Sequence, residues 1–95
     1  MANTATGTTQ IDNEAVRVTE WAFSPGAETG MHIHEMDYVV VPLKDGQLRI
    51  IDPQGNESVA DLRAGVSYYR KKGVHHNVIN ANDYDFAFIE VEMKA

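Results

Sequence analysis

Two histidines lie two residues apart in the segment GMHIHEMDY, residues 30–38. The segment otherwise reads as an apolar β-strand, in which alternate side chains point to the same face of a sheet. His32 and His34 can therefore converge on one point, which is the spacing that a metal site needs. A third ligand would have to come from GVHHNVIN, residues 73–80, which holds the other two histidines. A single histidine on a strand is usually a packing residue or a solvated one. For a His-x-His pair with a distant third histidine, two interpretations remain open: such ordinary roles, or a metal site.

The composition restricts the ligands that such a site can use. The 95 residues include no cysteine, which excludes a disulfide framework, a cysteine-based zinc site and a thiol nucleophile. Any metal must therefore be bound by histidine, aspartate or glutamate. With 14 acidic and 8 basic side chains and a net charge of −6, the chain has no basic footprint for nucleic acid.

Short runs of β-branched and aromatic residues are separated by turn residues at intervals of roughly ten residues, which is typical of all-β sandwiches and barrels. No segment shows a helical period, and the connections are too short to contain helices. The pattern predicts about eight antiparallel strands in a double-sheet jelly roll or a small barrel, with any ligand bound in its mouth.

The chain reads as one domain with a short N-terminal extension. Its first ten residues, MANTATGTTQ, are small, polar and uncharged, and they lack the basic start and apolar run of a signal peptide. No apolar stretch reaches the ~18 residues of a transmembrane helix. We therefore expect a flexible arm over residues 1–12, a single domain over residues 13–95, and a cytoplasmic protein with no membrane or nucleic-acid partner.

Two spaced motifs make the chain resemble the cupin superfamily. The first motif, G-x5-H-x-H-x3–4-E-x6-G, is matched by Gly26, His32, His34 and Gly46. The second, G-x5-P-x-G-x2-H-x3-N, is matched at every spacing, with Lys71 in place of its proline, by Gly65, Gly73, His76 and Asn80. The resemblance extends over residues 15–93, and within the superfamily the chain looks like the small single-domain cupins described as β-alanine degradation proteins. It implies a cupin-type double-stranded β-helix, that is, a jelly-roll barrel, and a metal bound by His32, His34 and His76.

The glutamate of the first motif has no counterpart in this chain. Its place falls at Tyr38 or Val39, and neither residue is acidic. A slightly longer hairpin would let Asp37 take the position, and Tyr38 could instead direct its phenol toward the metal. The fourth ligand position is therefore left open between Asp37, Tyr38 and water. His75 must point to the face opposite that of its neighbour His76, so we exclude it as a ligand.

Three neutral imidazoles would leave the charge of a divalent ion uncompensated, which favours an anionic small-molecule ligand. The resemblance and the histidine set are compatible with iron, nickel, zinc, manganese or copper. Arg70 or Lys71 could draw a carboxylate to the mouth, although a solvated turn is the more ordinary explanation of these charges. Two functions remain open: a metal-dependent enzyme acting on a small carboxylate or carbonyl compound, and a binding or sensing cupin that performs no chemistry.

The aromatic residues are expected to pack in the core or in a dimer interface, because a small jelly roll needs large side chains to fill it; they are Trp21, Phe23, Tyr68, Tyr69, Phe86 and Phe88. Alternate residues of the last strand are first phenylalanine, at 86 and 88, and then glutamate, at 90 and 92. Because this face changes from apolar to acidic, we expect the strand to leave the barrel and pack on a partner. We therefore expect a homodimer, since a chain this short buries little apolar surface alone and buries more in an interface with a second copy. Asn80 is expected to fix a turn or loop backbone.

Overall fold

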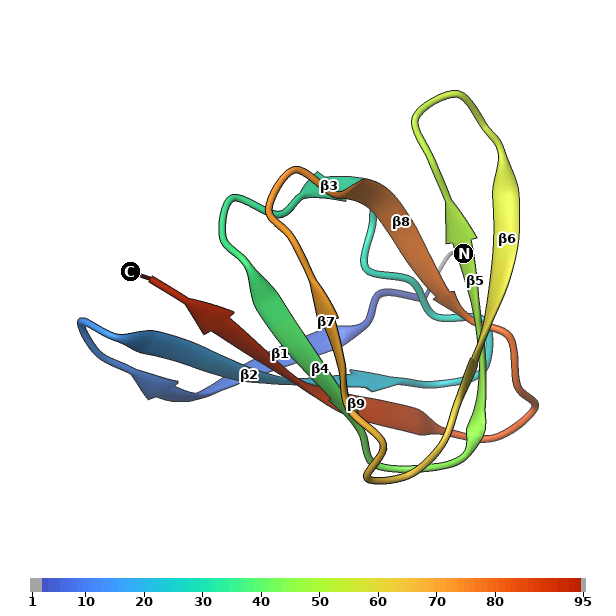
Figure 1. Cartoon of the computed structure of the whole chain (residues 1–95). Coiled ribbons are helices and arrows are strands. Elements are labelled where there is room, and N and C mark those ends of the chain that lie inside the picture. The colour runs from blue at the N-terminus through green and yellow to red at the C-terminus, as the bar shows by residue number, and fades with distance from the viewer. Residues whose placement is uncertain (1–2, 95) are drawn as a thin grey trace.

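Every regular element in the computed structural model, which describes residues 3–94, is a β-strand (Figure 1). The all-β prediction is confirmed, and residues 3–94 contain no helix that could span a membrane. The strands are β1 (Thr6–Asp12), β2 (Val16–Phe23), β3 (His32–Ile33), β4 (Tyr38–Pro42), β5 (Gly46–Ile51), β6 (Glu57–Leu62), β7 (Tyr68–Arg70), β8 (His75–Asn80) and β9 (Phe86–Met93).

The strands form two antiparallel sheets. One has five strands in the order β1-β2-β9-β4-β7, and the other has four strands in the order β3-β8-β5-β6. Figure 1 shows the β5–β6 hairpin at one side of the molecule and the β1–β2 turn with the C-terminal end of β9 at the other. Within each sheet, strands that are distant in the sequence are neighbours, as in a jelly roll, so the predicted double-stranded β-helix is confirmed.

The apolar core is built from alternate residues of facing strands. On β9, Phe86 and Phe88 are buried, whereas Ala87 and Ile89, which point to the other face, are only partly buried. Phe88 packs against Phe23 of β2, with ring centroids 5.5 Å apart. Leu48, from β5 of the other sheet, belongs to the same buried cluster. These three phenylalanines pack in the core as predicted, whereas Tyr69 is exposed.

Strand β1 occupies much of the segment in which the sequence suggested a flexible arm over residues 1–12. All seven of its residues are exposed, so apolar burial does not hold it in place. Instead its backbone pairs with β2 in an antiparallel ladder, in which Gly7 lies opposite Trp21. A Cβ atom at Gly7 would come within 2.9 Å of the indole ring, so the absence of a side chain lets the ring lie against the strand. The composition of the segment could not reveal this pairing, because backbone hydrogen bonds need no apolar side chains.

Strand β9 lies in the centre of the five-stranded sheet, between β2 and β4. The prediction that the last strand leaves the barrel is therefore wrong, whereas its packing on a partner stays a prediction. The strand changes character along its length because its inward positions face two different environments. Phe86 and Phe88 face the apolar core, and Glu90 and Glu92 are buried beside the cavity described below.

Candidate metal centre

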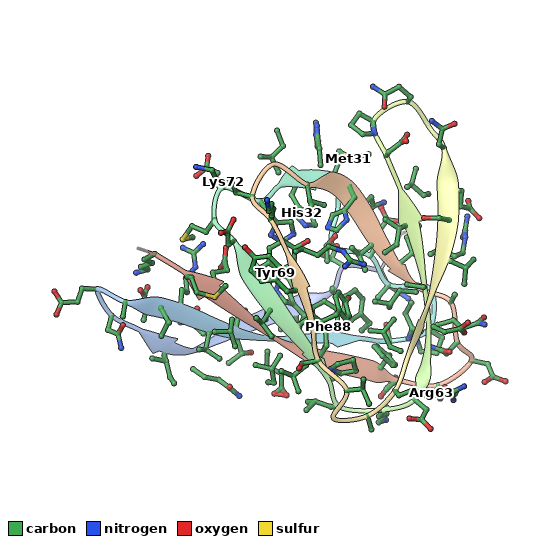
Figure 2. The ribbon with its side chains drawn as sticks, viewed as in Figure 1. Met31, His32, Arg63, Tyr69, Lys72 and Phe88 are labelled. Carbon is green, nitrogen blue, oxygen red and sulfur yellow. The ribbon has the colours of Figure 1, made fainter. Side chains whose placement is uncertain are left out.

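Three imidazoles converge at one end of the barrel. His32 lies on β3 directly opposite His76 on β8, and His34 follows β3 in the chain. The Nε2 atom of His34 lies 3.0 Å from Nε2 of His32 and 3.2 Å from Nε2 of His76. In Figure 2, His32 lies at the same end of the molecule as Lys72, and Arg63 lies at the opposite end. The structure thus brings together the three histidines that the motifs suggested as ligands, in a group that could hold a metal ion.

Backbone hydrogen bonds hold the segment after β3 in position. The amide of His34 donates to the carbonyl of Val74 at 2.9 Å, and the amide of Gly73 donates to the carbonyl of His34 at 2.7 Å. Gly73 has a φ of 100°, a conformation that glycine adopts without steric cost and other residues rarely adopt. The glycine of the second motif therefore lets the turn before β8 close on His34.

The histidine donor set fits a divalent transition metal. Nδ1 of His32 lies 2.8 Å from the carbonyl oxygen of Gly30, which can only accept, so Nδ1 carries the proton. In the neutral ring, the Nε2 lone pair is then directed at His34. A proton on Nε2 of His34 could serve only one of its two neighbouring nitrogens. A metal ion would satisfy all three nitrogens, with the Gly30 carbonyl orienting one ligand ring from behind.

Burial keeps two of the imidazoles neutral. Desolvation, followed by the charge of His32, lowers the pKa of His34 from 6.5 to about 4. The same two causes, in the same order, lower the pKa of His76 to about 4. Both rings are therefore unprotonated at neutral pH, which is the form that binds a metal.

His75 lies next to His76 on β8 but on the outer face of the strand. It is exposed and pairs with Ile33, which is also exposed. The alternation of the strand thus separates the two neighbouring histidines, as the sequence suggested.

Asp37 does not lie with the three histidines. Its carboxylate accepts hydrogen bonds from the Tyr69 hydroxyl at 2.8 Å and from the Lys72 amide at 2.9 Å. These contacts, the Lys72 amide first, hold the pKa of Asp37 below its usual value. The carboxylate therefore joins β4 to β7 and the turn that follows, so the alternative that placed Asp37 in the fourth ligand position does not hold.

Tyr38 contacts the histidine cluster through its ring. The ring is buried and stacks on the imidazole of His34, with centroids 3.9 Å apart and planes 18° from parallel. Burial raises the pKa of the Tyr38 phenol, so it stays protonated. Tyr38 therefore fixes the plane of one candidate ligand ring.

Sequence reasoning missed the two glutamates of β9 as residues of the site. In the ladder between β4 and β9, Glu92 lies opposite Tyr38 and Glu90 lies opposite Val40. Both glutamates are buried, and with His34 they form a second group whose candidate ligand atoms lie within 4.8 Å of one another. The sequence signal was the parity of the last strand, which placed both on the same face as the phenylalanines.

The two glutamates differ in their partners. Glu92 accepts from Nε and Nη2 of Arg17 at 2.9 and 3.2 Å, a bidentate ion pair. Glu90 has no ion pair among residues 3–94. Burial, followed by the charge of Glu92, raises the pKa of Glu90 from 4.5 to about 7, and the indole N–H of Trp21 acts in the opposite direction.

A cavity of about 260 Å³ connects the histidines with the glutamates. Its lining includes the three histidines and both glutamates, together with apolar side chains such as Phe88. Neither Arg70 nor Lys71 lines it; the Arg70 guanidinium lies over the Tyr68 ring, 4.7 Å from its centroid. The basic residue of the cavity is Arg17, which the sequence analysis did not consider.

Asn80 acts on the backbone rather than on the cavity. Its amide nitrogen donates to the carbonyls of Phe23, Ser24 and Tyr84 at 3.3, 3.2 and 2.9 Å. The side chain is buried and does not line the cavity. The motif asparagine therefore fixes the chain around it, as the sequence suggested.

Comparisons with known proteins agree with this architecture. Residues 19–92 match the family model described as Cupin domain. The chain is 56% identical to the Beta-alanine degradation protein BauB of Pseudomonas aeruginosa over 90 residues, which are 95% of this chain and 94% of that protein. A crystal structure of a cupin domain from Bordetella pertussis Tohama I superposes with a TM-score of 0.96 at 54% identity, covering 100% of this chain and 98% of that chain. A protein from Klebsiella pneumoniae with a double-stranded β-helix domain shares the fold, with a TM-score of 0.77 at 23% identity over 96% of this chain and 77% of that chain. By its sequence and its fold, the chain belongs to the cupin domain family.

Proposed function

We propose that this cupin binds a divalent transition metal, namely iron, nickel, zinc, manganese or copper, through His32, His34 and His76, and acts on a small carboxylate or carbonyl compound. The observation that carries the proposal is the convergence of the three Nε2 atoms on one point. The similarity to a protein named for β-alanine degradation supports a role in the breakdown of small amino acids or their keto acids.

The side chains around the histidines support chemistry on such a compound. A bound divalent ion would polarise a carboxylate or carbonyl oxygen, or acidify a bound water. Tyr38 and the Gly30 carbonyl hold two of the imidazoles in place, so the ligand set is preorganised. The apolar part of the cavity, which includes Phe88 and Leu48, limits access of water to the reacting groups.

Metal content tests the proposal directly. We expect one metal ion per chain in the wild-type protein and none in His32→Ala, measured by elemental analysis after dialysis. Asp37→Ala is the matched control, because its carboxylate is held by β7 and the turn that follows; this variant should keep the metal. Full metal content in His32→Ala would contradict the proposed ligand set.

A binding or sensing cupin without catalysis is the second candidate. One observation favours it: β4 carries Tyr38 and Val39 at the two positions where the glutamate of the first cupin motif could fall, so the acid or base that this glutamate could supply is absent from that strand. Oxygen uptake by the iron-loaded protein with a panel of β-amino and β-keto acids separates the two candidates. Consumption with one compound supports the enzyme, and saturable binding without turnover supports the sensor.

We also propose that the chain forms a homodimer. Because β9 has a neighbouring strand on both sides, it has no free edge that could pair with a second copy. The edge of β1, which is fully exposed and has a neighbour on one side only, remains as a surface for a second copy.

A further inference from the structure

The cavity contains one buried carboxyl group, Glu90, that forms no ion pair with a cation of the described chain. Glu92 is paired with Arg17 through two hydrogen bonds. Glu90 is only 8% exposed and lines the same cavity, and no ion pair reaches it within residues 3–94. The indole N–H of Trp21, followed by the charge of Arg17, favours the charged form of Glu90, and burial opposes it more strongly. A carboxylate has room for several donors, so Glu90 can still accept from a ligand.

Burying a carboxylate without a partner is unfavourable, and a cationic group that enters the cavity would remove this penalty. The aromatic residues near Glu90 suit such a group. Trp21, Tyr68 and Phe88 all line the cavity, and the faces of aromatic rings attract an ammonium ion. The carboxylate and the rings together form a site for an organic cation.

Glu90 lies beside one of the three histidines, with a carboxylate oxygen within 4.8 Å of a ring nitrogen of His34. The three histidines form one group, and Glu90, Glu92 and His34 form another, so the two groups share His34. Glu90 does not belong to the group that contains His32 and His76. A molecule of few heavy atoms could contact both groups, and a cavity of about 260 Å³ is of the size that such a molecule needs.

We propose that the cavity binds a small zwitterionic amino acid, with its carboxylate toward the three histidines and its ammonium group on Glu90. This inference rests on the proposed function, because the metal on the histidines is what would attract the carboxylate of the ligand. It adds a second recognition element that selects ligands by a positive charge. The anionic ligand expected from the histidines alone is thereby replaced by a compound that carries both charges.

Isothermal titration of the zinc-loaded protein with three probes tests the inference. The probes are 3-aminopropanoate, 3-hydroxypropanoate and propanoate, which share a carboxylate and differ in the group that would reach Glu90. We expect 3-aminopropanoate to bind about 10- to 100-fold more tightly than propanoate, the range set by one hydrogen bond to a charged group. 3-Hydroxypropanoate should bind less tightly than 3-aminopropanoate, because it has a donor but no charge.

The variant Glu90→Gln should bring the affinities for 3-aminopropanoate and propanoate close to one another. Glu20→Gln is the matched control: it makes the same charge change on β2, where strand alternation places Glu20 on the face opposite Trp21, and it should keep the preference. The zinc-to-protein ratio is measured in every preparation. If Glu90→Gln does not fold, the affinities of the wild-type protein for the three probes still test whether the cavity selects an ammonium group.

The outcomes separate the inference from the proposed function. A zinc-loaded protein that binds the three probes equally, or prefers propanoate, overturns the ammonium site and leaves the metal site standing. Equal binding of 3-aminopropanoate and 3-hydroxypropanoate also overturns it, because Glu90 would then recognise a hydrogen-bond donor and not a charge. A wild-type protein that takes up no zinc or other divalent metal overturns both.

Discussion

At the scale of single residues, His75 and His76 offer a direct contrast, because they are adjacent on β8 and face opposite sides. Metal at about 100 times its dissociation constant should stabilise the folded state by about 2.7 kcal/mol. Chelation should then lower the melting temperature by an amount on the order of 10 °C. Calorimetry should show this shift in the wild-type protein and in His75→Ala, and no shift in His76→Ala. Loss of the shift in His75→Ala alone would mean that the wrong histidine has been assigned.

The metal-free protein should lose stability as the pH falls from about 6.5 to about 4. The pKa values of His34 and His76 are lowered from 6.5 to about 4 in the folded state, so the unfolded chain binds protons first in this range. Each histidine can change the free energy of unfolding by at most about 1.4 kcal/mol per pH unit, and access of solvent to the cavity makes this change smaller. Urea unfolding at several pH values in the presence of chelator measures the slope. His76→Asn should flatten it, and His75→Asn should not; equal slopes in all three proteins would contradict the prediction.

Glu90 should have the opposite effect on the pH dependence of stability. Its pKa is raised from 4.5 to about 7 in the folded state, so the folded chain keeps a proton that the unfolded chain has lost. The stability that this proton confers is present below pH 4.5 and is lost as the pH rises through about 7. In metal-free protein, Glu90→Gln should therefore gain stability relative to the wild type as the pH rises across this range. Chemical denaturation of both proteins at matched pH values checks this, and a difference that does not change with pH would contradict it.

The residues of the site differ in how far the sequence could identify them. His32, His34 and His76 carry their signal in local spacing, because a His-x-His pair faces one side of any strand. For Glu90 and Glu92, the parity of the last strand indicates only that they share a face with the phenylalanines. They enter the site through the register between β4 and β9, and that register depends on the whole sheet. The same register places Glu92 opposite Tyr38, and no local sequence pattern predicts this pairing.

At the scale of elements, the contact between β1 and β2 should be sensitive to a side chain at Gly7. A Cβ atom there would come within 2.9 Å of the Trp21 ring, so Gly7→Val should displace the ring and reduce the free energy of unfolding by about 1–3 kcal/mol. Trp21 is the single tryptophan of the chain, so its fluorescence reports the displacement directly. Thr8→Val changes the next residue, which points to the opposite face, and should leave both the emission and the stability near the wild-type values. An unchanged emission spectrum in Gly7→Val would count against this packing.

Strand positions were more predictable than strand partners. The alternation of β9 and the turn residues between the strands are local features, and they were sufficient for an all-β jelly roll without helices. The place of β9 in the centre of a sheet depends on contacts with distant segments. The pairing of β1 with β2, which are consecutive in the chain, is a hairpin that the composition did not reveal. For β1, the small polar residues of TGTTQID suggested a loose segment, although threonine and isoleucine are well suited to a strand once a partner edge is available.

At the scale of the whole molecule, we expect a homodimer in solution. A 95-residue chain buries a modest share of its surface, and the exposed edge of β1 can extend its sheet across a twofold axis. Sedimentation velocity over a range of micromolar concentrations should give a species of twice the 10.6 kDa chain mass. A compact monomer throughout that range would show that the edge stays unpaired.

The central place of β9 also affects when the protein can fold. Of the nine strands, β9 is the last to leave the ribosome, yet both β2 and β4 pair with it. Arg17 and its partner Glu92 are 75 residues apart in the sequence, so that ion pair joins the earliest and latest parts of the domain to be synthesised. Until β9 arrives, β2 and β4 have no common neighbour, and the phenylalanines and glutamates that complete the interior are missing. The domain can therefore complete its fold only after β9 has been synthesised, and its folding is dominated by long-range contacts, which slow it and expose the unfinished chain to aggregation.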